Sequence, residues 1–231
     1  MYGLLQEVNV SLDSSPTTWI SRLTGTGAYK LGVNYAPGIL PQKYANTRGY
    51  AQNLWLHGPE HYLTEVGTMN LFVVLGQDGP AANASTYELI TPPLDGMILP
   101  GVTRDSVLTL AREHASGKNP LNGLQGKNVI VSERPITMNE VKEASLSGKL
   151  IELFGAGESY SYGWGEGAND FYLLTGTAAV ISPVDRIGYL GEDVLIPTGS
   201  DGMGPVSRAV WKELVGRQTG EIPSEWGVVV A

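Results

Sequence analysis

The apolar run Met69–Leu75 constrains the fold of this chain more than any other stretch of the sequence. It is short, uncharged and rich in branched and aromatic side chains, which predicts a buried strand. A loop of Gly, Pro, Ala and Asn residues, Gln77–Ser85, follows it. Tyr87–Thr91 then has the pattern of a second strand. We therefore expect a hairpin with a long tip over residues 69–91.

The other predicted elements mix helices and strands without a regular alternation. Pro100-Gly101 opens one helix, the capping-box pair Thr137 and Glu140 opens another, and Pro205 starts the last. This mixture favours the α+β class over a doubly wound parallel sheet. In chain order, we expect a helix at Pro41–Arg48 closed by Gly49, a strand at Gln52–Leu56, helices at Thr103–His114 and from Thr137 through Leu146 to Gly148, a strand at Ala178–Ile181 and a helix from Pro205.

The composition excludes several classes of protein. The chain has 231 residues and is 42% hydrophobic, which supports a sizeable core, and its net charge of -8 is opposite to the basic footprint of a general nucleic-acid binder. No apolar stretch approaches the length of a membrane span, and Met1–Leu12 lacks the pattern of a secretory signal or a mitochondrial presequence. Because there is no cysteine, disulfides, thiolate metal sites and cysteine nucleophiles are excluded.

Common catalytic and metal-binding motifs are also missing from the sequence. There is no Gly-x-Ser-x-Gly elbow of a serine hydrolase, no P-loop and no dinucleotide fingerprint. His57 and His61 are four residues apart, but Gly58-Pro59 between them breaks any helix that would align their rings. We interpret both as surface histidines in a turn and predict no metal site.

Four short clusters could carry chemistry. Lys30 lies among glycines and tyrosines, where desolvation would favour the neutral amine that forms imines. Glu65 directly precedes an apolar strand, and Pro100-Gly101 presents the backbone N–H groups of a helix start to an anion. The Gly-rich turn Phe154–Gly157 is followed by Thr177 after a segment rich in Gly and aromatic residues. Taken singly, the four have plain interpretations: a surface lysine, a loop carboxylate, a helix cap and a loop.

Taken together and in this order, the clusters resemble the large domain of branched-chain amino-acid aminotransferases. The matching strings are YKLGVNYAPG, QNLWLHG, LTEVGTMNLF, ELITPPLDGMILPGVTRDSVL, VSERPITMNEV and AVISPVDRIGY. The resemblance spans Thr24–Trp226 and implies the fold-type IV large domain, an α+β pseudo-barrel of strands with surrounding helices. It therefore predicts an unmatched segment over residues 1–23 and a cofactor-binding large domain over residues 24–231.

The resemblance implies that the chain binds pyridoxal 5'-phosphate. In the family, the lysine of the Tyr-Lys-Leu-Gly string forms the Schiff base and then shuttles the proton between substrate and cofactor. This catalytic role falls on Lys30. Tyr35 matches the tyrosine that bonds the phenolic oxygen of the cofactor. Glu65 matches the carboxylate that pairs with the pyridine nitrogen and keeps it protonated, so that the ring withdraws electrons.

Five further positions of the family's site fall on this sequence. By resemblance, Leu99 packs on one face of the cofactor ring. The backbone N–H groups of Val102 and Thr103 bind the phosphate, which agrees with the argument from the helix start. Thr177 adds a contact to the phosphate. Thr177 and Ala178 together help to bind the carboxylate of the substrate.

The reaction that the resemblance implies is amino-group transfer between leucine, isoleucine or valine and 2-oxoglutarate. An apolar side-chain pocket suits these substrates. The family also implies a homodimer that acts on small molecules, with no nucleic-acid or membrane partner, in the cytoplasm or in mitochondria. Two alternatives stay open: an inactive fragment, truncated or mis-spliced, of such an enzyme, and another fold-type IV enzyme such as a D-amino-acid aminotransferase or an aminodeoxychorismate lyase.

The sequence departs from the family at its start and within one turn. Family members carry a small N-terminal domain before the lysine, whereas 29 residues precede Lys30. We therefore expect the small domain to be missing and the chain to have little or no transaminase activity. The family turn Phe-Gly-x-Gly-Thr-Ala is interrupted by residues 158–176. This atypical insertion is rich in Gly and aromatic residues and lacks a helical or strand period. It is either a surface loop of this lineage or a translated intron.

We predict that residues 158–176 are a translated intron. Gly157-Glu158-Ser159 can be encoded as GGT GAG TCN, which contains the splice donor GTGAGT, and Thr175-Gly176 as ACA GGN, which contains an AG acceptor. Removing nineteen codons between these sites restores Phe-Gly-Ala-Gly-Thr-Ala-Ala in frame. Sequencing of transcripts from the eukaryotic source should therefore find mature messages without these codons. Dominant messages that retain them would rule the intron out.

Overall fold

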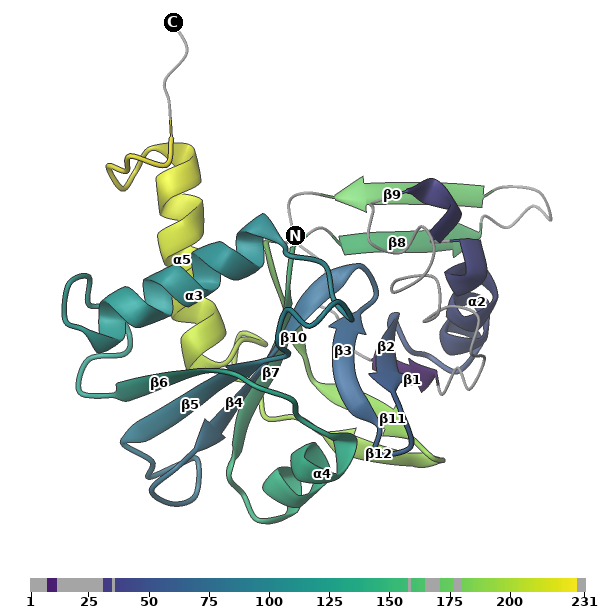
Figure 1. The fold of residues 1–231 in the computed structure, drawn as a ribbon, viewed down its shortest axis with the longest axis horizontal. Coiled ribbons are helices and arrows are strands. Elements are labelled where there is room, and N and C mark those ends of the chain that lie inside the picture. Colours follow the sequence, from purple (N-terminus) through teal and green to yellow (C-terminus); the bar gives the residue numbers. More distant parts are fainter. Residues whose placement is uncertain are drawn as a thin grey trace, which may run out of the picture.

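The computed structural model describes most of the chain (Figure 1), namely residues 8–11, 31–34, 36–157, 159–164, 171–176 and 180–227. The strands are β1 (Val8–Ser11), β2 (Gln52–His57), β3 (Tyr62–Val66), β4 (Met69–Gly76), β5 (Thr86–Thr91), β6 (Asn128–Glu133), β7 (Leu150–Ala156), β8 (Ser159–Trp164), β9 (Phe171–Gly176), β10 (Ile181–Val184), β11 (Arg186–Tyr189) and β12 (Glu192–Leu195). The helices are η1 (Gly32–Asn34), η2 (Ala36–Gly38), α2 (Ile39–Thr47), α3 (Val102–Ala115), α4 (Met138–Leu146) and α5 (Pro205–Thr219).

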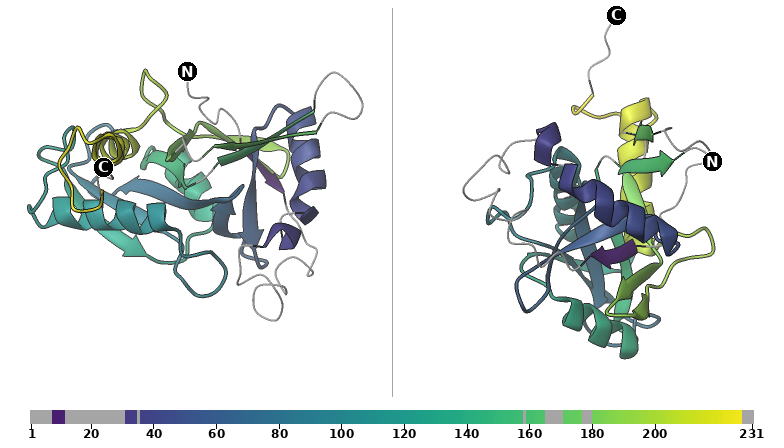
Figure 2. Two further views of the ribbon diagram at one scale, coloured as in Figure 1. Left: turned by 90° about the horizontal axis from the view of Figure 1, so that it is seen from above. Right: turned by 90° about the vertical axis from the view of Figure 1, so that its right-hand side faces the viewer.

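A mixed, ten-stranded sheet forms the centre of the fold (Figures 1 and 2). Its strand order is β10-β7-β4-β3-β2-β1-β11-β12, and β5 lies between β4 and β6. One edge of β4 bonds to β3 through residues 69–70 and then to β5 through residues 73–76, while the other edge bonds to β7. Because β3 and β5 pair with the same edge of β4 in succession, the sheet splays into a half-barrel, which agrees with the pseudo-barrel that the resemblance implies.

The run of apolar residues in β4 is continuous because both faces of the strand are buried. Leu71 and Val73 pack into one core, which includes the buried side chains of α4. Phe72 and Val74 point the other way, into a second core beneath α3 and α5, where the ring of Phe72 stacks on Phe154 of β7 at 5.1 Å between centroids. Alternate residues of a strand face opposite sides, so a strand covered on both sides shows no polar alternation.

The predicted hairpin and helices are confirmed, with small shifts at their ends. β4 and β5 pair antiparallel on either side of the loop that contains Pro80 and Asn83. The hydroxyl of Thr137 accepts the backbone N–H of Glu140 at 3.2 Å, as the capping pair predicts, and α4 ends before Gly148, whose φ is +69°. α2, α3 and α5 lie where the sequence places helices.

One segment without a strand pattern forms strands, and one predicted strand is shifted. Residues 158–176 lack a strand period, yet β8 and β9 pair antiparallel within this segment as a separate two-stranded sheet, because backbone pairing does not require an alternating pattern. Figure 1 draws this hairpin apart from the main sheet, on the side where α2 lies. The strand predicted at Ala178–Ile181 instead occupies Ile181–Val184, where its backbone pairs with β7. Ala178 lies outside the described residues.

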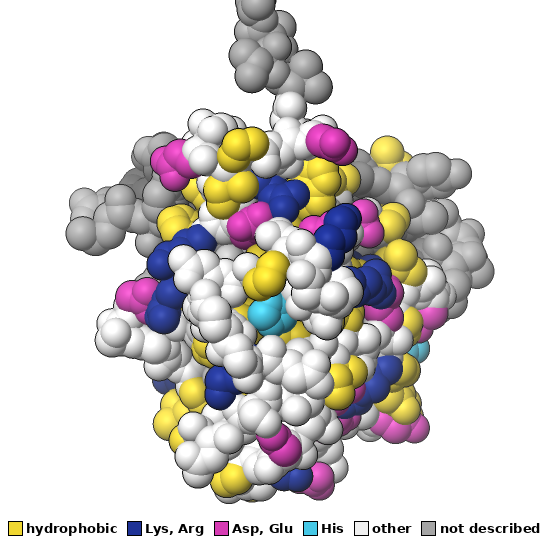
Figure 3. Space-filling view, turned by 90° about the vertical axis from the view of Figure 1, so that its left-hand side faces the viewer, with side chains coloured by type: hydrophobic (Ala, Val, Ile, Leu, Met, Phe, Trp, Pro, Cys, Tyr) yellow, Lys and Arg dark blue, Asp and Glu magenta, His cyan; other side chains and the backbone are white. Residues whose placement is uncertain are grey.

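The surface carries acidic and basic side chains side by side. Figure 3 shows this mixture on the face at the left of Figure 1. Some of these side chains form ion pairs. Arg112 lies 2.6 Å from Glu133, and Lys118 lies 2.5 Å from Glu113. In the part of the chain that the structure describes, no helix is both long and apolar enough to cross a membrane.

A buried carboxylate joins β7 to the start of α5. Glu152 is 2% exposed and accepts the backbone N–H groups of Val206 at 2.6 Å and of Ser207 at 3.2 Å. It thereby caps the helix in place of the N-cap residue Gly204, where a Cβ would overlap the carboxylate. Burial raises the pKa of Glu152 to about 7, although the hydrogen bonds from Ser207 and Val206 favour the charged form.

Because of Glu152, the stability of the fold should fall as the pH rises from 4.5 to about 7. Over this range the folded chain holds a proton on the carboxyl group that the unfolded chain releases. Glu152→Gln cannot ionise, so the difference in unfolding free energy between wild type and this variant should change by on the order of 3 kcal/mol across the window. Urea unfolding at each pH measures it, with the exposed Glu143→Gln as the control. Parallel pH profiles of wild type and Glu152→Gln would contradict the prediction.

Candidate active site

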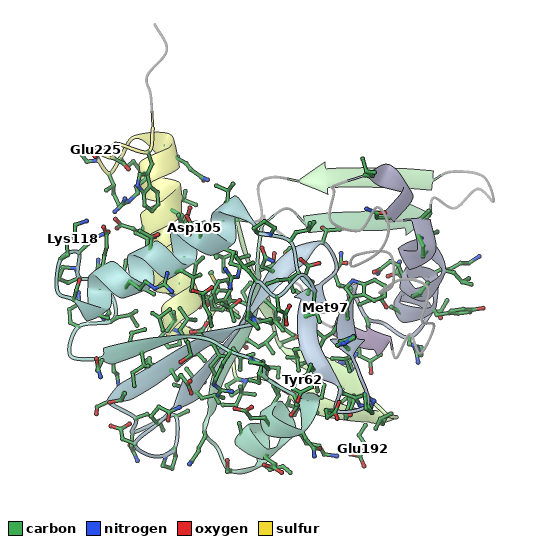
Figure 4. The ribbon with its side chains drawn as sticks, viewed as in Figure 1. Tyr62, Met97, Asp105, Lys118, Glu192 and Glu225 are labelled. Carbon is green, nitrogen blue, oxygen red and sulfur yellow. The ribbon has the colours of Figure 1, made fainter. Side chains whose placement is uncertain are left out.

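Three elements bring their ends together at one edge of the sheet. Glu65, before the β3–β4 turn, lies opposite Asn70 in the strand register, and Asn70 lies opposite Ala156 near the end of β7. The segment from β5 to the start of α3 reaches the same edge. Figure 4 labels its residue Met97 near the centre of the molecule. Residues far apart in the sequence therefore assemble one site.

Glu65 is buried at this edge, with 8% of its surface exposed. Its Oε1 accepts the backbone N–H of Leu99 at 2.9 Å and the side-chain amide of Asn70 at 3.3 Å. The same amide nitrogen of Asn70 donates to the carbonyl of Leu99 at 2.8 Å. A buried carboxylate keeps its charge only when hydrogen bonds replace its lost hydration, and these bonds favour the charged form. Glu65 can therefore serve as a fixed negative charge for a protonated ring nitrogen.

The start of α3 lies beside this carboxylate and has no side-chain cap among the described residues. Its N-cap is Gly101, which supplies no side-chain cap, and the side chain of Val102 is 84% exposed. The first N–H groups of a helix, together with its dipole, attract negative charge. A Cβ at Gly101 would overlap Oδ1 of Asn70, so glycine lets the helix start pack directly on the Glu65–Asn70 pair. A ligand with both a basic ring nitrogen and a phosphate, such as pyridoxal phosphate, fits these two features.

The buried side chain of Arg104 links the first turn of α3 to the segment before it and to β6. It is 3% exposed, and its Nη2 donates to the carbonyl of Pro92 at 2.9 Å and to Glu133 at 2.7 Å. The guanidinium groups of Arg104 and Arg112 lower the pKa of Glu133. Since Pro92 begins the segment that leads to α3, the guanidinium of Arg104 ties the two ends of that segment together.

The end of β7 approaches the site through two glycines. A Cβ at Gly155 would lie 2.9 Å from the methyl group of Met69 and 3.0 Å from Val66, so glycine allows β7 to approach the β3–β4 turn. Gly157 has a φ of +133° and donates its N–H to the carbonyl of Val180 at 3.1 Å. Val180 itself has a φ of +45°, which is rare for a branched residue and marks a strained backbone beside the site.

The structure thus brings half of the predicted site residues together at one edge and leaves the other half undescribed. The residues that it places there are Glu65, Leu99, Val102 and Thr103. The predicted residues that lie outside the described part of the chain are Lys30, Tyr35, Thr177 and Ala178. Asn70 and Arg104 have no role that the sequence predicted. The one signal available for Asn70 was a polar residue at the start of an otherwise apolar strand.

Comparison with known sequences agrees with this geometry. The profile of the family described as "Amino-transferase class IV" matches residues 25–148. The mitochondrial branched-chain-amino-acid aminotransferase of Schizosaccharomyces pombe is 43% identical over 208 residues, which cover 88% of this chain and 40% of the relative. The cytosolic enzyme of Saccharomyces cerevisiae is 42% identical over 208 residues, or 89% of this chain and 47% of that protein. The chain therefore spans less than half the length of these relatives.

Solved structures share the fold. A branched-chain amino acid aminotransferase from Escherichia coli, 25% identical, superposes with a TM-score of 0.60 over 98% of this chain and 56% of that one. The enzyme from Thermobaculum terrenum, solved in its PLP form and 23% identical, also gives 0.60, over 96% and 52% of the two chains. The chain therefore belongs to the class IV aminotransferase family. Within that family it is similar to the branched-chain-amino-acid aminotransferases.

Substitution of Gly101 should test the packing at the start of α3. In Gly101→Ala the new methyl group would overlap Oδ1 of Asn70, so the helix start has to move away from the Glu65–Asn70 pair. Overpacking of this kind should lower the free energy of unfolding by about 1–3 kcal/mol. Urea denaturation measures the loss. Gly227→Ala is the matched control, because a Cβ there meets only a carbonyl at 3.8 Å. Equal stabilities of the two variants would refute the packing argument.

Proposed function

We propose that this protein takes part in pyridoxal-phosphate-dependent transfer of amino groups between branched-chain L-amino acids and 2-oxoglutarate. The observation that carries the proposal is the fixed, buried carboxylate of Glu65 next to the open start of α3. Together they suit the ring nitrogen and the phosphate of this cofactor. The identities of 43% and 42% to enzymes named for branched-chain amino acids support the substrate class.

Pyridoxal phosphate, when bound, supplies an electron-withdrawing ring that stabilises negative charge at the substrate Cα. In the proposal, Lys30 holds the cofactor through its amine and then carries the proton of the substrate Cα. Tyr35 hydrogen-bonds the phenolic oxygen. Glu65 faces the ring nitrogen with a full negative charge and so holds a proton on that nitrogen. A neutral side chain at position 65 would leave the nitrogen unprotonated and the ring a weaker electron acceptor.

The remaining site residues orient the cofactor and the substrate. Leu99 packs on the ring face, and its position is fixed because its N–H bonds to Glu65 and its carbonyl to Asn70. The N–H groups of Val102 and Thr103 bind the phosphate at the first turn of α3. Thr177 and Ala178 hold the substrate carboxylate, with Thr177 also at the phosphate.

The proposal extends to the organisation of the chain. Residues 24–231 form the cofactor-binding large domain, and residues 158–176 are an insertion within it. Residues 1–23 do not match the family, although their strand β1 pairs with β2 and β11 in the main sheet. The protein acts on small molecules and forms a homodimer as the family does. Relatives are named for both the cytosol and the mitochondrion, so either compartment suits this activity.

Reductive labelling of the chain tests the proposal. Pyridoxal phosphate added to the purified protein and reduced with borohydride should label Lys30, which peptide mapping locates. Lys30→Ala should abolish the label, and the exposed Lys43→Ala should keep it. L-leucine, but not D-alanine, should change the absorption spectrum of the bound cofactor before reduction. Labelling at another lysine, with Lys30 clean, would refute the assignment.

Glu65→Gln completes this test, because it separates cofactor binding from cofactor chemistry. The variant should still label at Lys30, but the ring nitrogen should lose its proton, which ¹⁵N NMR of labelled cofactor reports. The charge-assisted bond that is lost is worth roughly 1.5–3 kcal/mol. Glu60→Gln, at an exposed turn, is the control. A protonated ring nitrogen in Glu65→Gln would show that the residue is a bystander.

A further inference from the structure

Asn70 stands at the point where the elements of the cofactor site meet. It is the second residue of β4, it is 5% exposed, and its register partners are Glu65 in β3 and Ala156 in β7. Such a place inside an apolar strand would normally hold an apolar side chain. Burial of an amide costs free energy unless the amide is hydrogen-bonded. The hydrogen-bond partners of Asn70 therefore indicate its structural role.

The amide closes a ring of three hydrogen bonds. Its Nδ2 donates to Oε1 of Glu65 at 3.3 Å and to the carbonyl of Leu99 at 2.8 Å, and the N–H of Leu99 donates to the same Oε1 at 2.9 Å. Both protons of one nitrogen are thus used on two different elements, a strand and the segment before α3. Because each bond constrains the other two, neither the carboxylate of Glu65 nor the peptide of Leu99 can turn alone.

The carbonyl oxygen of the Asn70 side chain, Oδ1, packs against Gly101 at the start of α3. Oδ1 of Asn70 fills the space that a Cβ of Gly101 would occupy, and the N–H of Gly101 donates to the carbonyl of Leu99 at 2.9 Å. That carbonyl is the same atom that Nδ2 of Asn70 binds. One side chain therefore contacts Glu65 on one side and the residue that begins α3 on the other.

No other side chain of similar size supplies both contacts. Aspartate has the same shape but no N–H, and beside Glu65 it would replace a hydrogen bond with a contact between two carboxylates. Leucine fills the space but makes none of the bonds, and glutamine is longer by one methylene group. The geometry therefore calls for the neutral amide with its two donors.

We propose that Asn70 is a positioning residue, which sets the separation between the carboxylate of Glu65 and the start of α3. A cofactor holds its ring nitrogen and its phosphate in a rigid covalent frame, so the two protein groups that receive them must keep a matching separation. This inference rests on the proposed function for the identity of the cofactor. It adds that the affinity for the cofactor depends on Asn70, which acts through Glu65 and Leu99.

Hydrogen exchange and cofactor binding in Asn70→Leu and Asn70→Asp test the proposal. In the chain without added cofactor, the amides of residues 97–103 should exchange about tenfold faster in both variants, since the ring that holds Leu99 is broken. The dissociation constant for pyridoxal phosphate should rise about tenfold or more, as the loss of hydrogen bonds to a charged group implies. Only in Asn70→Asp should affinity fall further as the pH rises, because the proton shared by two adjacent carboxylates is then lost.

Asn119→Asp is the matched control, because Asn119 also donates its amide to a glutamate, Glu213, at 3.1 Å and lies away from the site. It should change neither the exchange of residues 97–103 nor the affinity for the cofactor. Normal exchange or normal cofactor affinity in Asn70→Leu would overturn the proposal. If the wild type takes up no cofactor, the proposed function fails, while the exchange measurement on the cofactor-free chain still decides whether Asn70 fixes the segment.

Discussion

The hydrogen bonding of a buried carboxylate at the edge of the sheet is the constraint on which the described part of the site depends. Glu65 has lost most of its contact with water, and its hydrogen bonds to Leu99 and Asn70 replace it. These bonds fix the position of Leu99 in the segment before α3. They also require glycine at position 101, because a Cβ there would overlap Oδ1 of Asn70. The open helix start next to the carboxylate is thus a consequence of how the charge is satisfied.

The sheet supplies that edge because of β4. Its neighbours β3 and β5 pair with one edge at different points, residues 69–70 and residues 73–76, so the strands splay. The segment before α3 reaches the start of β4 through the bond from Asn70 to Leu99. Burial of both faces of β4 keeps this strand rigid, and Glu152 fastens the adjacent strand β7 to α5. The described part of the site therefore rests on two strands that are buried throughout, which suits a rigid cofactor.

Local signals predicted the parts of the fold that depend on neighbouring residues. The apolar run of β4 and the capping pair Thr137 and Glu140 are examples. The edge strands β6 and β12 were not predicted, because their exposed faces carry charged residues such as Glu133 and Glu192. The buried strands β3 and β7, which lie inside the sheet, were not predicted either. The start of α3 followed from the Pro100-Gly101 turn, and the role of Glu65 from the resemblance to the family. The bond from Asn70 to Leu99 could not be predicted from spacing, since it joins residues whose approach depends on the path of the intervening chain.

The pairing of β4 with β7 also governs the order in which the chain can fold. Phe72 pairs with Phe154, so one apolar edge of the central strand stays unpaired on the ribosome until β7 has been synthesised. An unpaired edge of this kind is a template for association with other chains. Substitutions that delay the docking of β7 should therefore reduce the yield of soluble protein through aggregation during synthesis, even where the finished molecule would be stable.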